Sequence, residues 1–171
     1  MRRLVGSTAF LFASASGAVG CPAGSETFLS CTFEGGAKYV ETCVQSGSAT
    51  YRFGRTGQTP DLEFSEPLES VGYTPWSGAG WTVGEDLSFH NGDTTYRVAG
   101  LASRGPVDDE QDLAEPSGRL TVEQDGINVA VLSCDAGSVD FPWSQAIYNA
   151  KQDAGQCWNH PELTWSDCDM N

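Results

Sequence analysis

The feature that most constrains how this chain folds is an alternation of apolar and polar residues, broken at short intervals by turn-forming pairs. Two such alternating segments centre on Asn91-Gly92 and Asp125-Gly126. A period of two puts every second side chain on one face of a strand, and Asn-Gly and Asp-Gly are strong signals for a two-residue hairpin turn. Both segments therefore predict antiparallel β-hairpins.

A two-residue turn also predicts the register of its hairpin, because it decides which residues lie opposite each other. In the first hairpin the expected pairs are His90 with Asp93, Phe89 with Thr94, Leu87 with Tyr96 and Glu85 with Val98. In the second they are Gln124 with Ile127, Val122 with Val129 and Leu120 with Val131. Both registers bring the apolar side chains together.

Five earlier runs have the composition of strands: 28–33, 39–44, 49–53, 61–64 and 71–73. One helix is expected over 141–154, with Asp140 as its N-cap, Pro142 in its first turn and Gly155 at its end. The predicted fold class is all-β, an antiparallel meander of about eight strands that forms a small barrel or sandwich with one C-terminal helix.

The first 20 residues have the pattern of a secretory signal peptide, with Arg2 and Arg3 before an apolar run that ends in small residues. Cleavage after Ala15 or after Gly20 fits that pattern equally well. Residues 21–171 are expected to form a single exported domain, periplasmic or secreted, of undetermined oligomeric state. A lipoprotein acylated at Cys21 is an alternative, although Ala18 stands where such signals carry a large aliphatic residue.

Six cysteines in an exported chain predict up to three disulfides. Cys31 and Cys43 lie on two predicted strands joined by a Gly-rich turn, so they are expected to pair across a hairpin. Cys157 and Cys168 are expected to close the C-terminal loop, which leaves Cys21 for Cys134. Other pairings stay open. The Cys-x-x-Cys spacing typical of zinc sites is absent, and we expect no metal and no other cofactor.

The chain is strongly acidic, with 9 Lys and Arg against 23 Asp and Glu and a formal net charge of −14. Nucleic acids require basic surface, so the favoured macromolecular partner is a cationic protein. Acidic residues crowd the segment 104–118, which is expected to be a long loop. Asp108, Asp109, Glu110 and Asp112 offer oxygen atoms to calcium there, but they lack the spacing and central glycine of an EF-hand loop.

Signals for catalysis are weak. The chain has no Gly-x-Ser-x-Gly motif, and its two histidines, His90 and His160, lie beside turn-forming residues. Paired carboxylates support glycoside hydrolysis in other proteins, yet no spacing here singles out one pair. No catalytic residue is therefore predicted.

The segment 73–81 is the best candidate for a binding surface. Tyr73, Trp76 and Trp81 surround the sequence Ser-Gly-Ala-Gly at 77–80. Glycines permit backbone angles that present flat rings to a ligand, and Trp and Tyr are frequent anchors at interfaces. With His90, these three aromatic residues are the predicted binding set. The alternative is that the rings cap the core of the domain.

Three segments, TYRFG at 50–54, YTPWSGAGW at 73–81 and SFHNGDTTYRV at 88–98, resemble landmarks of a family of short exported bacterial proteins without an established activity. The resemblance spans 28–101 and 132–134, and it implies the strand order but no catalytic residue. A looser similarity is to small disulfide-bonded barrels that inhibit lysozyme in the bacterial envelope. Residues 46–51 partly match their Ser-Gly-x-x-Tyr pattern, whereas their Lys-Gly element is missing.

These observations predict a non-enzymatic binding or inhibitor-like protein of the bacterial envelope that engages a cationic protein such as a lysozyme. One alternative is a carboxylate-based hydrolase that acts on envelope glycans. Another is a structural envelope protein with no discrete ligand.

Overall fold

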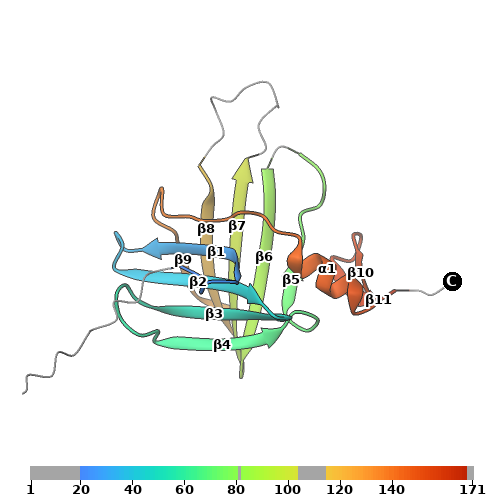
Figure 1. Cartoon of the computed structure of the whole chain (residues 1–171), viewed down its shortest axis with the longest axis horizontal. Coiled ribbons are helices and arrows are strands. Elements are labelled where there is room, and N and C mark those ends of the chain that lie inside the picture. Colours follow the sequence, from blue (N-terminus) through green and yellow to red (C-terminus); the bar gives the residue numbers. More distant parts are fainter. Residues whose placement is uncertain (1–19, 81, 104–114, 169–171) are drawn as a thin grey trace, which may run out of the picture.

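Two antiparallel sheets make up most of the computed structural model, which describes residues 20–80, 82–103 and 115–168 (Figure 1). The first sheet contains, in spatial order, β1 (Glu26–Phe33), β2 (Lys38–Gln45), β3 (Ser48–Arg55) and β4 (Leu62–Pro67). The second contains β5 (Gly72–Thr74), β6 (Thr82–Asn91), β7 (Thr94–Ser103), β8 (Ser117–Gln124) and β9 (Ile127–Ser133). In Figure 1 the strands of the first sheet run across those of the second. The described strands thus form two layers and no closed barrel, which confirms the predicted all-β meander.

The C-terminal part consists of helix α1 (Ala146–Asp153) and a hairpin of β10 (Gln156–Asn159) and β11 (Thr164–Asp167). The predicted helix over 141–154 starts too early. Asp140 is bonded in extended form to Ser30 of β1, and Trp143 has a φ of 51°, so neither residue adopts helical geometry. The helix does end before Gly155, whose φ is 80°. The hairpin brings the number of described strands to eleven rather than about eight.

The core lies between the two sheets, where side chains alternate inward along each strand. Its largest fully buried members include Tyr51, Phe33, Phe89, Leu29 and Leu87. Two glycines let the layers approach closely. A Cβ at Gly100 would lie 2.5 Å from the ring of Phe141, and one at Gly118 would lie 2.6 Å from Sγ of Cys134. Any larger residue at either position would displace the segment that follows β9.

The β6–β7 hairpin is confirmed, but its predicted register is wrong by two residues. The strands pair up to Asn91 opposite Thr94, so the turn is Gly92-Asp93, and Glu85 faces Gly100 rather than Val98. Gly92 has a φ of 64° and takes the first turn position, where a positive φ suits a hairpin. The same shift places His90 opposite Thr95, Phe89 opposite Tyr96 and Leu87 opposite Val98.

The turn Asp125-Gly126 of the β8–β9 hairpin is confirmed, and Gln124 does pair with Ile127. A bulge between Val122 and Glu123 then adds one residue to β9. Because side chains alternate, this single residue reverses the faces of the rest of the strand. The predicted pairs of Val122 with Val129 and Leu120 with Val131 are therefore wrong, and the observed partners are Ala130 and Leu132. Val129 and Val131 point to solvent instead, with 57% and 53% of their surface exposed.

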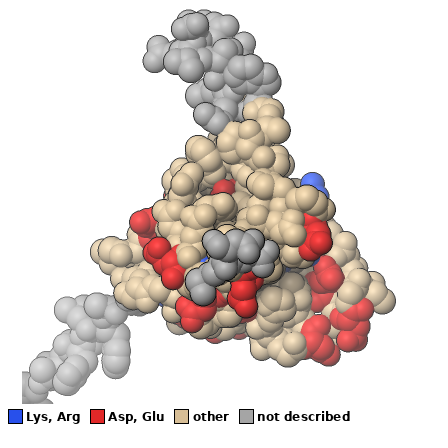
Figure 2. Space-filling view, turned by 90° about the vertical axis from the view of Figure 1, so that its right-hand side faces the viewer, with Lys and Arg blue, Asp and Glu red and all other residues tan. Residues whose placement is uncertain are grey.

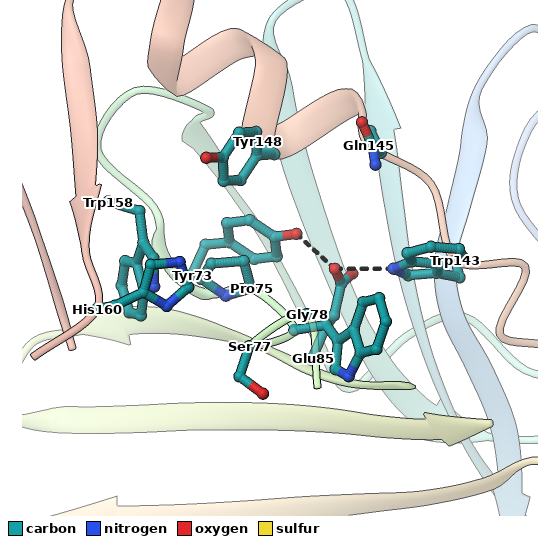
Figure 3. A pocket seen from close by; sticks show the side chains of 11 residues that line it. Tyr73, Pro75, Ser77, Gly78, Glu85, Trp143, Gln145, Tyr148, Trp158 and His160 are labelled. Atoms are coloured by element: carbon teal, nitrogen blue, oxygen red, sulfur yellow. Dashed lines mark hydrogen bonds between the residues drawn. The ribbon is translucent and has the colours of Figure 1, made fainter. Parts of the chain in front are cut away.

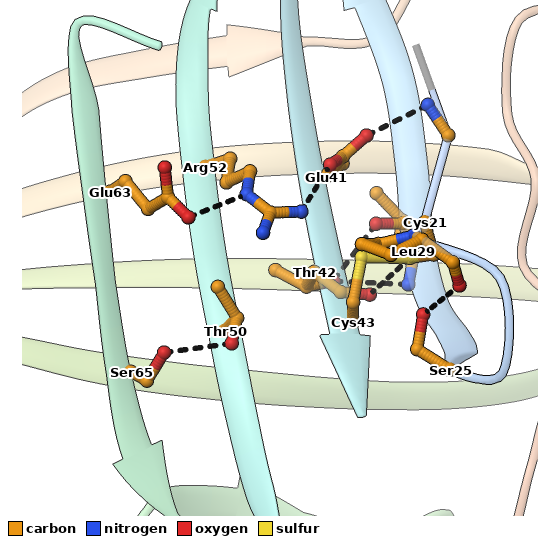
Figure 4. Close-up of polar contacts among 12 residues, drawn as sticks. Cys21, Ser25, Leu29, Glu41, Thr42, Cys43, Thr50, Arg52, Glu63 and Ser65 are labelled. Carbon is orange, nitrogen blue, oxygen red and sulfur yellow. Dashed lines mark hydrogen bonds and ion pairs between the residues drawn. A yellow bond between two sulfur atoms is a disulfide. The ribbon is translucent and has the colours of Figure 1, made fainter. Parts of the chain in front are cut away.

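Three disulfides are present, as predicted, but two of the pairings differ. Cys157 and Cys168 are bonded as expected, whereas the other two bridges are Cys21–Cys43 and Cys31–Cys134. The expected Cys31–Cys43 bridge is wrong because β1 and β2 place Cys31 opposite Val40. Three disulfides fit an oxidising compartment outside the cytoplasm. Since Cys21 is bonded to Cys43 (Figure 4), it has no free thiol to acylate.

Some predictions fall outside the described residues. These are the signal peptide with its Ala15 site and most of the acidic segment, since the description omits residues 1–19 and 104–114. Ser117 and Gly118, the end of the predicted acidic loop, belong to β8. Among the described residues, no helix has the length and apolar character needed to cross a membrane.

The chain after β9 is tied to β1 along its length. The Asp135 N–H donates to the Thr32 carbonyl at 2.8 Å, and Ser30 exchanges two backbone hydrogen bonds of 2.9 Å with Asp140. The Asp135 carboxylate accepts hydrogen bonds from Thr32 Oγ1 and from the Gly35 and Gly36 N–H groups. These bonds lower the pKa of Asp135, led by the one from Gly35. They direct the chain toward Phe141, Trp143 and α1.

A bulge in β1 depends on one buried hydroxyl, shown in Figure 4. The pairing of β1 with β2 shifts between Thr27 and Leu29, and Thr42 fills the resulting gap in the ladder. Its Oγ1 accepts from the Leu29 N–H at 3.0 Å and donates to the Leu29 carbonyl at 2.9 Å. Thr42 is fully buried, so water cannot replace either bond.

Replacing this hydroxyl tests that role. Thr42→Val is expected to lower the free energy of unfolding by about 2 kcal/mol or more, because a buried polar group left without a partner costs roughly 1–3 kcal/mol. The matched control is Thr50→Val on β3, whose hydroxyl contacts Ser65 Oγ at the surface and which should change stability by less than about 0.5 kcal/mol. Urea unfolding of both variants measures the difference. Equal losses would contradict the proposed role of Thr42.

Candidate functional site: an aromatic cavity around a buried glutamate

A cavity of about 300 Å³ lies where β5 and β6 meet the C-terminal segment (Figure 3). Most of its wall is aromatic and comes from parts of the chain that are far apart in sequence. The lining residues are Tyr73, Pro75, Trp76, Ser77, Gly78, Glu85, Trp143, Gln145, Tyr148, Trp158 and His160. Cavities of this size and composition are typical of sites for small ligands.

Glu85 supplies the one carboxylate among these lining residues. It belongs to the inward-facing row of β6, between Val83 and Leu87, and only 6% of its surface is exposed. Its Oε1 accepts two hydrogen bonds, from the Tyr73 hydroxyl at 2.8 Å and from Trp143 Nε1 at 3.0 Å. Its other oxygen, Oε2, is buried and accepts no hydrogen bond of normal geometry from any described residue.

Burial is the largest cause of the pKa shifts of Glu85 and Tyr73. It raises the pKa of Glu85, and the hydrogen bonds from Tyr73, Trp143 and the Trp76 backbone N–H only partly offset that effect. Burial, with the charge of Glu85 as a second cause, also raises the pKa of Tyr73, which keeps its hydroxyl protonated as a donor. The cavity thus holds a poorly solvated carboxyl group whose Oε2 accepts no hydrogen bond of normal geometry.

The aromatic walls are arranged at steep angles to one another. Trp76 and Trp143 meet edge to face, with centroids 5.7 Å apart and planes at 88°. Behind the cavity, Trp165 of β11 stacks on Tyr73 and also contacts Tyr148 and Trp158. Its Nε1 donates to the Tyr73 carbonyl at 2.7 Å. Trp165 therefore fixes the C-terminal hairpin to β5 and sets the positions of the rings in front of it.

A buried lysine supports this arrangement from outside the cavity. Lys151 of α1 is 3% exposed, and its Nζ donates to the Glu69 carbonyl at 3.0 Å. The same nitrogen lies 5.5 Å from the centroid of Trp165. Burial lowers the pKa of Lys151, and Glu69 opposes that effect. Lys151 is not among the lining residues and offers the cavity no counter-charge.

The predicted binding residues are only partly brought together. Tyr73 and Trp76 line the cavity. His90 lies elsewhere, at the exposed end of β6, where its Nδ1 is 3.7 Å from Glu66 Oε2 and its backbone N–H donates to Glu66. Trp81 lies outside the described residues. Glu66 and His90 form a surface contact between the two sheets rather than a part of the cavity.

Neither Glu85, at the centre of the cavity, nor the C-terminal wall was among the predicted binding residues. One signal for Glu85 was present, because it occupies an inward position of an alternating strand and so had to be buried. The other missed residues, Trp143, Tyr148, Trp158 and His160, carried no local signal. His160, noted in the sequence only as a histidine beside turn-forming residues, is exposed and also lines the cavity.

The face with the C-terminal hairpin is acidic. Figure 2 views the molecule from the side of α1, β10 and β11, and Asp and Glu are spread over this face with very little Lys or Arg. Exposed carboxylates of the C-terminal segment include Asp153, Glu162 and Asp167. Within the part of the chain that the structure describes, no group of three or more His, Cys, Asp or Glu is placed to hold a metal ion.

Comparisons with known proteins give no relative: no family model, no curated protein and no solved structure matches this chain. The resemblance to a family of short exported bacterial proteins, and the similarity to lysozyme inhibitors, accordingly stay predictions.

The burial of Glu85 predicts how the stability of the protein depends on pH. A carboxyl whose pKa is raised on folding stabilises the folded state below its unfolded pKa, near 4.5, and this contribution is lost as pH rises through the folded pKa. Glu85→Gln keeps an acceptor for Tyr73 and Trp143 and removes the charge. It should therefore raise the denaturation midpoint at pH 7 relative to the native chain.

This gain should shrink as the pH is lowered toward 4, because Glu85 is then neutral in the native chain as well. Urea unfolding of both proteins at several pH values provides the measurement. The matched control is Glu123→Gln on β8, which makes the same charge change away from the cavity lining and should show no such trend. A loss of stability at pH 7 that persists at pH 4 would contradict burial of an uncompensated charge at Glu85.

Proposed function

We propose that this protein is a non-enzymatic, extracytoplasmic binding protein that holds its ligand in the aromatic cavity around Glu85. The observation that carries the proposal is a buried carboxylate whose Oε2 accepts no hydrogen bond of normal geometry from a described residue. The cavity around it is walled by Tyr73, Trp76, Trp143, Tyr148 and Trp158. Leaving a polar atom unpartnered in the interior costs stability, and such costs are concentrated at sites where a ligand supplies the missing contact.

A hydrolase is less well supported, although a carboxyl with a raised pKa in a cavity is what an acid catalyst needs. Glycoside hydrolysis takes two carboxylates that face each other across the bond to be cleaved. Glu85 is the one carboxylate among the described lining residues, and its neighbour Asp86 points to the opposite face of β6 because side chains alternate. No hydrogen bond or ion pair joins His160 to Glu85, so nothing in the described residues orients this imidazole as a base for that carboxyl.

The acidic surface favours a second candidate, the binding of a cationic protein such as a lysozyme. Its support is the formal charge of −14 together with the carboxylates on the face shown in Figure 2. Such a surface accelerates the approach of a basic partner through long-range attraction. The two candidates are compatible, because α1 and the C-terminal hairpin contribute both to the cavity wall and to this acidic face.

Filling the cavity tests the first proposal. Ser77 is exposed at the cavity wall, so Ser77→Trp should occupy the space while changing the free energy of unfolding by less than about 0.5 kcal/mol. Native mass spectrometry and tryptophan fluorescence after incubation with a low-molecular-mass envelope extract should show binding by the native chain and its loss in the variant.

The control is Ser65→Trp on β4, which adds the same ring outside the cavity and should bind like the native chain. If Ser77→Trp binds the same components as the native chain, or if the native chain binds none, the cavity is not a ligand site.

The second candidate predicts salt-sensitive inhibition of lysozyme. Excess protein should reduce the activity of a basic lysozyme at low ionic strength, and the effect should fade as salt shortens the range of the attraction to about 8 Å at 0.15 M. Unchanged lysozyme activity at low ionic strength would remove lysozyme as a partner and leave the cavity proposal untouched.

A further inference from the structure

The ligand class can be read from the chemistry of the free carboxylate oxygen. Glu85 is more than nine-tenths buried, Oε1 is already held by Tyr73 and Trp143, and Oε2 accepts no hydrogen bond of normal geometry from a described residue. Neither Lys nor Arg occurs among the described lining residues. What the site lacks is therefore both a positive charge and a donor that reaches Oε2 with normal hydrogen-bond geometry.

The walls around this oxygen favour a cation over a neutral group. Aromatic ring faces carry negative potential and attract a cation placed over them, most strongly where water is excluded. Five rings line the cavity, and the perpendicular packing of Trp76 on Trp143 leaves differently oriented surfaces around one space. In Figure 3 the carboxylate of Glu85 lies among these rings, between Tyr73 and Trp143.

We propose that the cavity binds the protonated amine of a ligand, an ammonium group that still carries N–H donors. This inference rests on the proposed ligand-binding function. A protonated amine supplies both missing elements, since its charge pairs with the carboxylate and one of its N–H groups bonds Oε2. A quaternary ammonium would contact the rings but leave Oε2 without a donor, and an alcohol would donate to Oε2 but leave the buried charge unpaired.

His160, the one Lys, Arg or His side chain among the described lining residues, does not fill this role. His160 is exposed, and its ring packs edge to face against Trp158 at a centroid distance of 6.3 Å. The structure gives it no hydrogen bond or ion pair to Glu85. The test is run near pH 8, where an alkylamine is still protonated.

Protonated amines have two sources outside the cytoplasm: free small amines and the lysine side chains of a basic protein. Both present the same group to Glu85. Benzylamine represents the first source, and N-acetyl-lysine methylamide represents the second. Benzyl alcohol and benzyltrimethylammonium are matched to benzylamine in shape, and each removes one of the two features that the proposal requires.

Calorimetric titration of the full chain with these four probes tests the proposal. We expect at least one of the two protonated amines to bind, and benzylamine to bind about tenfold or more tightly than the alcohol and the quaternary ion. Glu85→Gln should weaken binding of the amine by about tenfold or more and leave the alcohol within about twofold. Glu123→Gln should bind every probe like the native chain. Whichever amine binds more tightly identifies the source.

Two results would overturn the inference. The first would exclude only the proposed ligand class, and the second would also exclude the proposed ligand-binding function. If the alcohol binds as tightly as the amine and Glu85→Gln changes neither, the ligand is not a cation, although a ligand cavity remains. If none of the probes binds and Ser77→Trp also leaves binding of the envelope extract unchanged, both the ligand class and the proposed function fail. Circular dichroism of Glu85→Gln confirms in either case that the variant is folded.

Discussion

The structure depends on the attachment of the chain after β9 to the edge strand of the opposite sheet. The Cys31–Cys134 bridge joins β1 to the end of β9, and the backbone bonds of Asp135 and Asp140 continue that attachment along β1. The two sheets are thereby cross-linked at one place, and a short segment is guided across their interface. Gly100 and Gly118 are necessary for this, since a side chain on either would collide with Phe141 or Cys134. The rest of the site follows from where this segment leads.

It leads to Trp143, whose indole N–H reaches Glu85 on the far sheet. The positive φ of Trp143 prevents the helix from starting there, and this irregular turn directs the indole toward the carboxylate while α1 begins at Ala146. An ideal helix from Asp140 would satisfy local propensity better. The energetic cost of the irregular segment and of a buried charge at Glu85 falls on one small region, which agrees with the binding site that we propose there.

The elements of the fold were predictable because alternation and turn chemistry are local. The registers of the two hairpins were harder to predict than the strands themselves, for two different reasons. The shift of the β6–β7 hairpin is an even number of residues, so Phe89 and Leu87 keep their face and the apolar pattern fits either register. The β8–β9 bulge does change faces, but a bulge arises from packing that a pattern of apolar residues does not encode. Two of the predicted disulfide pairings were wrong because they also depend on long-range packing. Cys31 faces the second sheet, and its partner Cys134 is 103 residues away in the sequence.

The site was harder to predict than the fold because its walls come from three separated segments. The stretch around Tyr73 and Trp76 was recognisable by composition, and Glu85 by its inward position in β6. The third wall depends on Trp165, which packs on Tyr73, Tyr148 and Trp158 at once and so fastens the C-terminal hairpin to β5. Only tertiary packing brings that hairpin to the carboxylate. Since the hairpin also carries Asp167 and its own disulfide, the segment with the weakest sequence signal both closes the cavity and makes its surroundings acidic.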